Sequence, residues 1–141
     1  MLKLLLPVDD SEHIVGRVDS LTAWLSRIPV AVEVHLLNVQ PSVSGDVGLF
    51  ISGDQIRDYQ RDEGQKALAP ARAKLEMAKV PYVLHIGVGE PATNIVQFAE
   101  DNQCDQIVMG PDGLGNLSSL FSGSVTARVV QETDIPVLIM K

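Results

Sequence analysis

The chain contains the segment GPDGLGNLSSLFSGS at residues 110–124, between an apolar run at 107–109 and a helical pattern at 125–131. Its glycines therefore fall where a buried strand leaves a sheet and again where a helix begins. In α/β proteins, ligands bind in the crevice beyond the carboxyl ends of the strands. A helix start adds unpaired N–H groups and the positive end of the helix dipole, which suit a phosphate. Glycine lets the backbone approach such a group closely, so the segment predicts a ligand-binding turn.

Apolar runs and helical spacings alternate along the rest of the chain. The predicted strands are residues 2–8, 30–39, 82–88, 105–110 and 135–140, and the predicted helices are residues 12–27, 55–79, 90–102 and 123–133. This alternation predicts a parallel α/β sheet with helices on both faces. We expect a single domain over residues 1–141.

Three local features refine this prediction. Ser11 is the expected N-cap of the first helix. Pro70 either kinks the second helix or lies near a helix start. Residues 40–54 form a long loop, whose Phe50 and Ile51 either fold over a ligand or pack locally.

The composition narrows the class of protein. The 141 residues, 45% of them hydrophobic, suffice for one domain with a sizeable core. The net charge of −7 gives no basic footprint for nucleic acid and no polybasic segment for a membrane. No apolar run approaches the roughly 20 residues of a membrane span, and no signal-peptide pattern precedes Asp9. Cys104 is the single cysteine. We expect a cytoplasmic protein that binds neither nucleic acid nor membrane.

The glycine spacing resembles that of a known family. The pattern Gly110-x-x-Gly113-x₉-Gly123-Ser124 matches the nucleotide-binding signature of the universal stress protein family. Five further segments resemble the family in the right order: LLPVDDS at 5–11, LLNV at 36–39, GVGEPA at 87–92, DQIVMG at 105–110 and IPVLI at 135–139. The likeness covers nearly the whole chain and is far more specific than the glycines alone.

The resemblance implies a fold and a ligand. The fold is a three-layer Rossmann-like sandwich, with a five-stranded parallel sheet in the order 3-2-1-4-5. The ligand is ATP, or ADP or AMP, with or without Mg²⁺, and the assembly is a homodimer. The implied nucleotide-binding residues are Pro7, Val8, Asp9, Val39, Met109, Gly110, Gly113, Gly123, Ser124 and Val125.

Elementary chemistry supports two of these roles and also offers ordinary alternatives. Asp9 ends the first strand, where its carboxylate accepts hydrogen bonds from ribose hydroxyls or caps a turn with Asp10 and Ser11. Ser124 begins the last helix. It holds phosphate, directly or through Mg²⁺, or serves as an N-cap, and both roles are compatible.

The segment departs from ATP-binding relatives, which often carry small polar or basic residues between the first two signature glycines. Here Pro111 removes an N–H donor and Asp112 adds a negative charge, which either holds a divalent ion or points to solvent. Residues 110–124 contain no Lys or Arg. Arg128 is the nearest cation in sequence, and it reaches either a phosphate or a surface carboxylate. We therefore treat Asp112 and Arg128 as modulators of nucleotide affinity.

Sequence patterns of catalysis are absent. The chain lacks the Walker pattern G-x-x-x-x-G-K-[ST], the dinucleotide fingerprint G-x-G-x-x-G after the first strand and the hydrolase pattern G-x-S-x-G. We expect no catalytic residue, and at most a weak ATPase or autophosphorylation on a serine of the segment: Ser118, Ser119, Ser122 or Ser124.

Two functional hypotheses remain open. The first is a stress-response regulator that signals through nucleotide occupancy and dimerisation to an unidentified protein partner. The second is a dimeric interaction protein whose nucleotide pocket is vestigial. In both, the last strand from Pro136 to Met140 lies at a sheet edge and pairs with a second copy.

The histidines and the cysteine carry no recognisable site. His13, His35 and His85 lack metal-ligand spacing, so we expect no metal held by protein side chains alone. His35 and His85 fall on neighbouring predicted strands and are expected to come close. Cys104 precedes a strand and is expected to be a buried, unreactive thiol.

Overall fold

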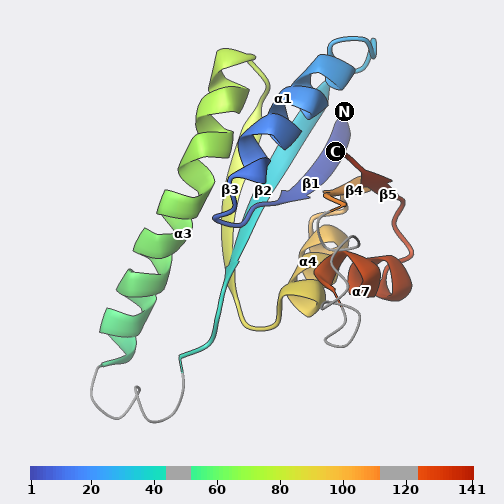
Figure 1. The fold of residues 1–141 in the computed structure, drawn as a ribbon. Coiled ribbons are helices and arrows are strands. Elements are labelled where there is room, and N and C mark those ends of the chain that lie inside the picture. Colours follow the sequence, from blue (N-terminus) through green and yellow to red (C-terminus); the bar gives the residue numbers. More distant parts are fainter. Residues whose placement is uncertain (44–51, 112–123) are drawn as a thin grey trace.

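A computed structural model describes residues 1–43, 52–111 and 124–141 of the chain. Its elements are β1 (Leu2–Pro7), α1 (His13–Leu25), β2 (Val32–Gln40), α3 (Gly53–Met77), β3 (Tyr82–Val88), α4 (Pro91–Asp101), β4 (Gln106–Met109), α7 (Val125–Glu132) and β5 (Val137–Ile139). The strands form one parallel sheet in the order β3-β2-β1-β4-β5 (Figure 1). The predicted α/β class and strand order are both confirmed.

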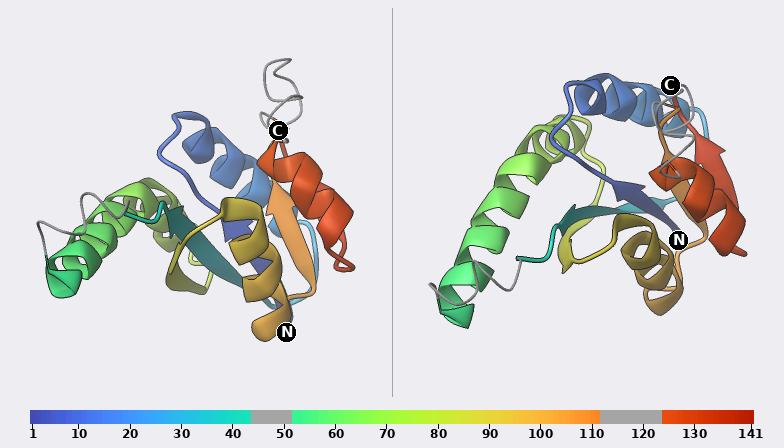
Figure 2. Two further views of the ribbon diagram at one scale, coloured as in Figure 1. Left: turned by 90° about the horizontal axis from the view of Figure 1, so that it is seen from below. Right: turned by 60° about the horizontal axis from the view of Figure 1, so that its bottom comes forward.

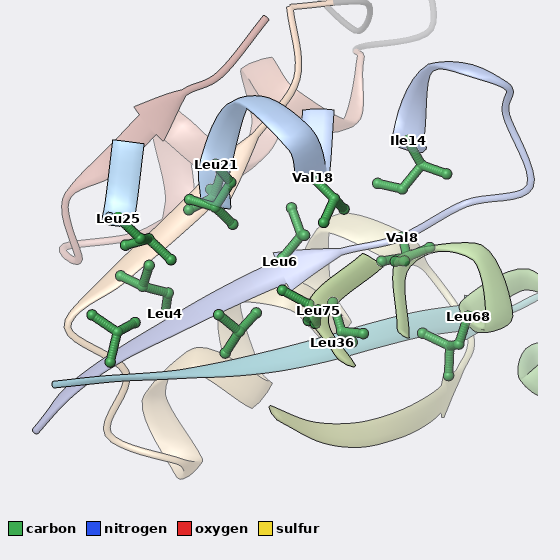
Figure 3. Close-up of a cluster of buried hydrophobic side chains, with 14 residues drawn as sticks. Leu4, Leu6, Val8, Ile14, Val18, Leu21, Leu25, Leu36, Leu68 and Leu75 are labelled. Atoms are coloured by element: carbon green, nitrogen blue, oxygen red, sulfur yellow. The ribbon is translucent and has the colours of Figure 1, made fainter. Parts of the chain in front are cut away.

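Helices cover both faces of the sheet, α1 and α3 on one and α4 and α7 on the other (Figure 2). Successive residues of β1 supply the two cores. Leu4 and Leu6 pack with α1 and α3, whereas Leu5 packs with α4 and α7 (Figure 3 shows the first of these clusters). All three side chains are fully buried. This is why the central strand reads as a continuous apolar run rather than as an alternation.

The start of α3 lies inside the segment that the sequence predicted to be a loop. Ser52 caps this helix through a capping box: its hydroxyl accepts from the Gln55 N–H at 3.1 Å, and the Gln55 side chain accepts from the Ser52 N–H at 3.0 Å. The two bonds satisfy N–H groups that a helix start leaves without partners. Pro70 lies within the helix and not at a start. The two loop residues singled out above, Phe50 and Ile51, are outside the described residues.

Glycine is required at two points near β3. Gly89 has a φ of +125°, which side-chain-bearing residues rarely adopt. It forms the turn from β3 to α4. Gly64 of α3 lies against β3, where a Cβ atom would be 2.8 Å from Cδ1 of Ile86. The absence of a side chain at residue 64 thus allows α3 to lie close to the sheet.

Candidate functional site

The order of the strands determines where in the fold the candidate site lies. The chain proceeds from β1 to β2 and β3 on one side, then crosses to β4 and β5 on the other side of β1. A crevice forms beyond the carboxyl ends of the strands where the direction reverses, between β1 and β4. In the register of these strands Leu5 pairs with Ile107. Val8 and Gly110, each three residues further, therefore lie at the same edge of the sheet.

Asp9 lies just beyond β1 and is exposed. Its Oδ1 accepts a 3.0 Å hydrogen bond from the N–H of Ser11, which is the turn-capping arrangement considered as an alternative for this carboxylate. The prediction that Ser11 is the N-cap of α1 is wrong. The N-cap is Glu12, which makes no side-chain cap bond. Ser11 lies one residue earlier, within the turn that Asp9 caps. The Ser11 hydroxyl is buried without a hydrogen-bond partner among the described residues.

The beginning of α7 is joined to the end of β4. The hydroxyl of Thr126 donates to the carbonyl of Gly110 at 3.1 Å, and Thr126 is buried. Ser124 is the N-cap of α7, and its hydroxyl accepts from the N–H of Ala127 at 3.1 Å. The N-cap role predicted for Ser124 is thus observed. The positions assigned to the glycine turn, namely Asp112, Gly113 and Gly123, lie outside the described residues.

Arg128 reaches carboxylates, as one of its two predicted alternatives stated. Its guanidinium lies 2.6 Å from Oε1 of Glu90 and 3.3 Å from Oε1 of Glu132. Glu90 is also the N-cap of α4, where it accepts from the N–H groups of Ala92 and Thr93. Burial alone would raise the pKa of Glu90, but the hydrogen bonds from Thr93 and Ala92 and the charge of Arg128 hold it below the usual value. The carboxylate therefore stays charged and links α4 to α7.

His35 and His85 come together as expected from their strands. Nδ1 of His35 lies 2.8 Å from Nε2 of His85, and the rings are stacked. The other nitrogen of His35 lies 2.7 Å from a carboxylate oxygen of Glu33, and Phe98 of α4 packs edge-on against His85. Burial, then the charge of His35, lower the pKa of His85. In the described part of the chain, no group of three or more His, Cys, Asp or Glu side chains is arranged to hold a metal ion.

Cys104 is buried, as predicted. Burial raises the pKa of its thiol, so the thiol stays protonated near neutral pH. A protonated, enclosed thiol is a poor nucleophile, and Cys104 is therefore no candidate for chemistry.

Comparison with known proteins identifies the family of this chain. The sequence profile described as "Universal stress protein family" matches residues 1–141. The chain belongs to the universal stress protein family. Universal stress protein MJ0531 of Methanocaldococcus jannaschii is 34% identical over 145 residues, which covers 99% of this chain and 81% of that relative.

Solved structures of universal stress proteins share this fold. That of protein MJ0577 of Methanocaldococcus jannaschii has a TM-score of 0.77 and 31% identity, and covers 99% of this chain and 94% of the other. The universal stress protein of Archaeoglobus fulgidus in complex with dAMP has a TM-score of 0.69 and 23% identity, and covers 100% of this chain and 98% of the other. The second likeness shows the fold alone.

Several buried polar residues of this universal stress protein were not predicted from the sequence, and Asn38 and Arg17 are two of them. Asn38 of β2 donates to the carbonyl of Val8 at 2.7 Å and accepts from the Gln40 amide at 2.6 Å, so it ties the end of β1 to the end of β2. A polar residue within the apolar run of β2 was the available signal. Arg17 of α1 is also buried and donates to the carbonyl of Met140 beyond β5 at 3.3 Å. For Arg17, by contrast, a charged residue within a helical pattern gave no indication in the sequence that it would be buried.

None of the helices in the described ranges combines the length and the apolar character that a membrane crossing requires.

Proposed function

We propose that this universal stress protein binds an adenine nucleotide, ATP first among them, at the carboxyl ends of β1, β2 and β4. The observation that carries the proposal is the reversal of strand order between β1 and β4. It places Asp9 at the same edge of the sheet as Gly110, and hydrogen bonding from Thr126 holds the start of α7 beside Gly110. A carboxylate accepts hydrogen bonds from ribose hydroxyls, and a helix N-terminus binds phosphate. The two groups at one crevice therefore suit the two ends of a nucleotide.

The complete set of proposed contacts follows the family signature. The ribose and the base lie near Asp9 and the main chain of Val39, and the phosphates lie near the glycine turn and Ser124. Where Mg²⁺ accompanies the nucleotide, the Ser124 hydroxyl would help to hold it, and the ion would offset the phosphate charge. The choice of an adenine nucleotide follows the family signature, and the Archaeoglobus fulgidus protein that shares this fold was solved in complex with dAMP.

The proposed output is regulation rather than turnover. The described residues include no phosphate-gripping lysine at the start of α7, which a phosphoryl-transfer site of the Walker type requires. Nucleotide occupancy and pairing of β5 between two copies would instead present a surface to a protein partner. In the sheet, β5 pairs with β4 along one edge, and Ile139 of β5 is exposed.

Calorimetric titration with Mg-ATP, ADP and AMP tests the proposal, together with mass spectrometry of small molecules released on denaturation. We expect a saturable signal with one nucleotide per chain. In the Gly123→Val variant we expect affinity to fall by more than about tenfold, because a side chain obstructs the close backbone approach that a phosphate requires. Absence of any bound or binding nucleotide would refute the proposal.

The alternative function is that of an interaction protein with a vestigial pocket. The Glu90–Arg128 pair favours it, because the cation nearest the glycine segment in sequence is already neutralised by carboxylates. Under this alternative the protein remains a dimer and gives no calorimetric signal with Mg-ATP. Weak ATPase or autophosphorylation is a third hypothesis, for which phosphate release above that of Gly123→Val would be required.

A further inference from the structure

A cleft of about 420 Å³ lies beside the carboxyl ends of β1 and β2. This volume is within the range of small-molecule sites, roughly 300 to 1,000 Å³. Asp9 and Val39 line the cleft from the strand ends, and Tyr59, Ala67 and Pro70 line it from α3. Two residues assigned to nucleotide contact thus share one cavity with helix residues that no sequence motif indicated.

The far wall of the cleft is a single face of α3. Tyr59, Glu63, Lys66 and Pro70 line it, and their spacing of three or four residues brings side chains to the same side of a helix. The N-terminal half of α3 continues past the end of β1, alongside the last residues of β2 (Figure 1). The helix therefore extends to where a ligand at the strand ends would lie.

Tyr59 is the aromatic side chain of this wall, and 61% of its surface is exposed. The large apolar side chains that α3 buries, Leu68 and Leu75, pack into the core instead. An exposed aromatic ring on the wall of a cavity offers a flat surface on which a nucleobase stacks. Tyr59 is not among the buried side chains of the two hydrophobic cores.

The charges of the cleft indicate which end of a nucleotide it accepts. Among the described residues that line the cleft, Asp9, Asp10 and Glu63 contribute three carboxylates, and Lys66 contributes one cation, which lies 3.2 Å from Glu63. Carboxylates accept hydrogen bonds from ribose hydroxyls and repel phosphates. The buried hydroxyl of Ser11, which has no partner among the described residues, belongs to the same lining. Such an unsatisfied group is typical of a place where a water or ligand is bound.

We propose that this cleft holds the nucleoside of the bound nucleotide, with the base stacked on Tyr59 and the ribose hydroxyls donating to Asp9. The inference rests on the proposed function and adds to it a base-binding wall on α3. The phosphates leave the acidic cleft toward the start of α7. Tyr59 is a binding residue through its ring, and its hydroxyl is not required.

Two substitutions of Tyr59 and one control separate stacking from a structural effect. In Tyr59→Ala we expect the affinity for Mg-ATP and for adenosine to fall by the same factor, about 5- to 100-fold, because the lost contact is with the base. Tyr59→Phe keeps the ring and is expected to bind within about twofold of the wild type. Met77→Ala removes another exposed apolar side chain, 79% exposed at the opposite end of α3, and should leave affinity unchanged.

Proton NMR of the bound base gives a second readout. Ring-current shifts of the adenine protons are expected in the wild type and in Tyr59→Phe, and their loss is expected in Tyr59→Ala. A wild type that binds neither ATP nor adenosine would refute the proposed function and this inference with it. If the wild type binds, but Tyr59→Ala binds equally well or retains the shifts, the stacking wall is refuted and the proposed function stands.

Discussion

A carboxylate oxygen of Glu90 accepts a 2.6 Å hydrogen bond from Nη1 of Arg128 and a 3.1 Å hydrogen bond from the N–H of Ala92. One side chain thereby caps α4 and holds the first turn of α7. The N-terminal ends of two helices on the same face of the sheet are joined by this contact. The same contact places a carboxylate against the positive charge of Arg128.

Replacing Glu90 by Gln is therefore expected to strengthen nucleotide binding. The amide oxygen can still cap α4, but the charge opposite Arg128 is removed. We expect the affinity for Mg-ATP to rise about two- to fivefold, as for the removal of one nearby charge in a solvated setting. Calorimetry in 50 mM and 300 mM salt is the measurement, with a larger effect at low salt. Glu100→Gln removes an exposed charge from the same helix and serves as the control; an equal effect there would contradict the prediction.

The histidine pair predicts a loss of stability on acidification. Burial, then the charge of His35, place the pKa of His85 below its ordinary value of 6.5. The unfolded chain therefore binds more protons than the folded chain as the pH falls below about 6.5, and the free energy of unfolding decreases there. The hydrogen bond between the rings also needs one bare nitrogen, so it cannot persist when both rings are charged.

Urea denaturation between pH 7.5 and 5.5 measures this effect. We expect the free energy of unfolding of the wild type to fall over this interval more steeply than that of His85→Asn, which has no imidazole to protonate. His13→Asn removes an exposed histidine and should follow the wild type. Parallel curves for the wild type and His85→Asn would show that His85 makes no contribution.

The core on the α1 and α3 side should be sensitive to loss of volume. Leu36 of β2 is fully buried among side chains of the sheet, α1 and α3. We expect Leu36→Ala to lower the free energy of unfolding by about 2 to 5 kcal/mol, since it removes apolar contacts and leaves a cavity. Val30→Ala shortens a side chain that is 50% exposed and is expected to change stability by less than about 0.5 kcal/mol. Similar effects of the two changes would contradict the assigned burial.

The proposed homodimer depends on the edge of β5. Ile139 is exposed on this three-residue strand, and unpaired edges favour pairing with another chain. We expect the wild type to sediment as a dimer at micromolar concentration and Ile139→Lys as a monomer. Val130→Lys places the same charge on an exposed position of α7 and should remain a dimer. A monomeric wild type would refute the pairing.

The sheet order came from the family resemblance, whereas the element order was predictable from the residues because both faces of the sheet are buried. The strands therefore read as apolar runs, and the turn at Gly89 and the helix start at Pro91 carry residues suited to one conformation. The start of α3 was missed, although Ser52 and Gln55 have the spacing of a capping box. The Ser and Gly residues around it resemble a loop by composition.

Of the residues that line the proposed site, the positions at the strand ends could be predicted from the sequence, whereas those on α3 could not. Asp9 follows an apolar run, and so its position at the carboxyl end of a strand is a local property of the sequence. Tyr59 lies in a charged helix and reads as one more solvated residue. Its place in the cleft depends on how α3 crosses the sheet, which is decided by packing between segments far apart in the chain. Similarly, the choice of Glu90 as the partner of Arg128 follows from the tertiary arrangement of α4 and α7.

The close approach of Gly64 to Ile86 affects how near α3 lies to the sheet, and so affects the width of the cleft. Gly64 and Tyr59 lie on the same helix but on different faces, one against the sheet and the other toward the cleft. A single methyl group at residue 64 would act as a spacer under α3 and displace the helix, or force Ile86 to move. The width of the cleft can thus change through residue 64, which is not one of the residues that line it. If the cleft holds a nucleoside as proposed, the residue at position 64 would influence which nucleoside fits, although it lies on the buried side of the helix.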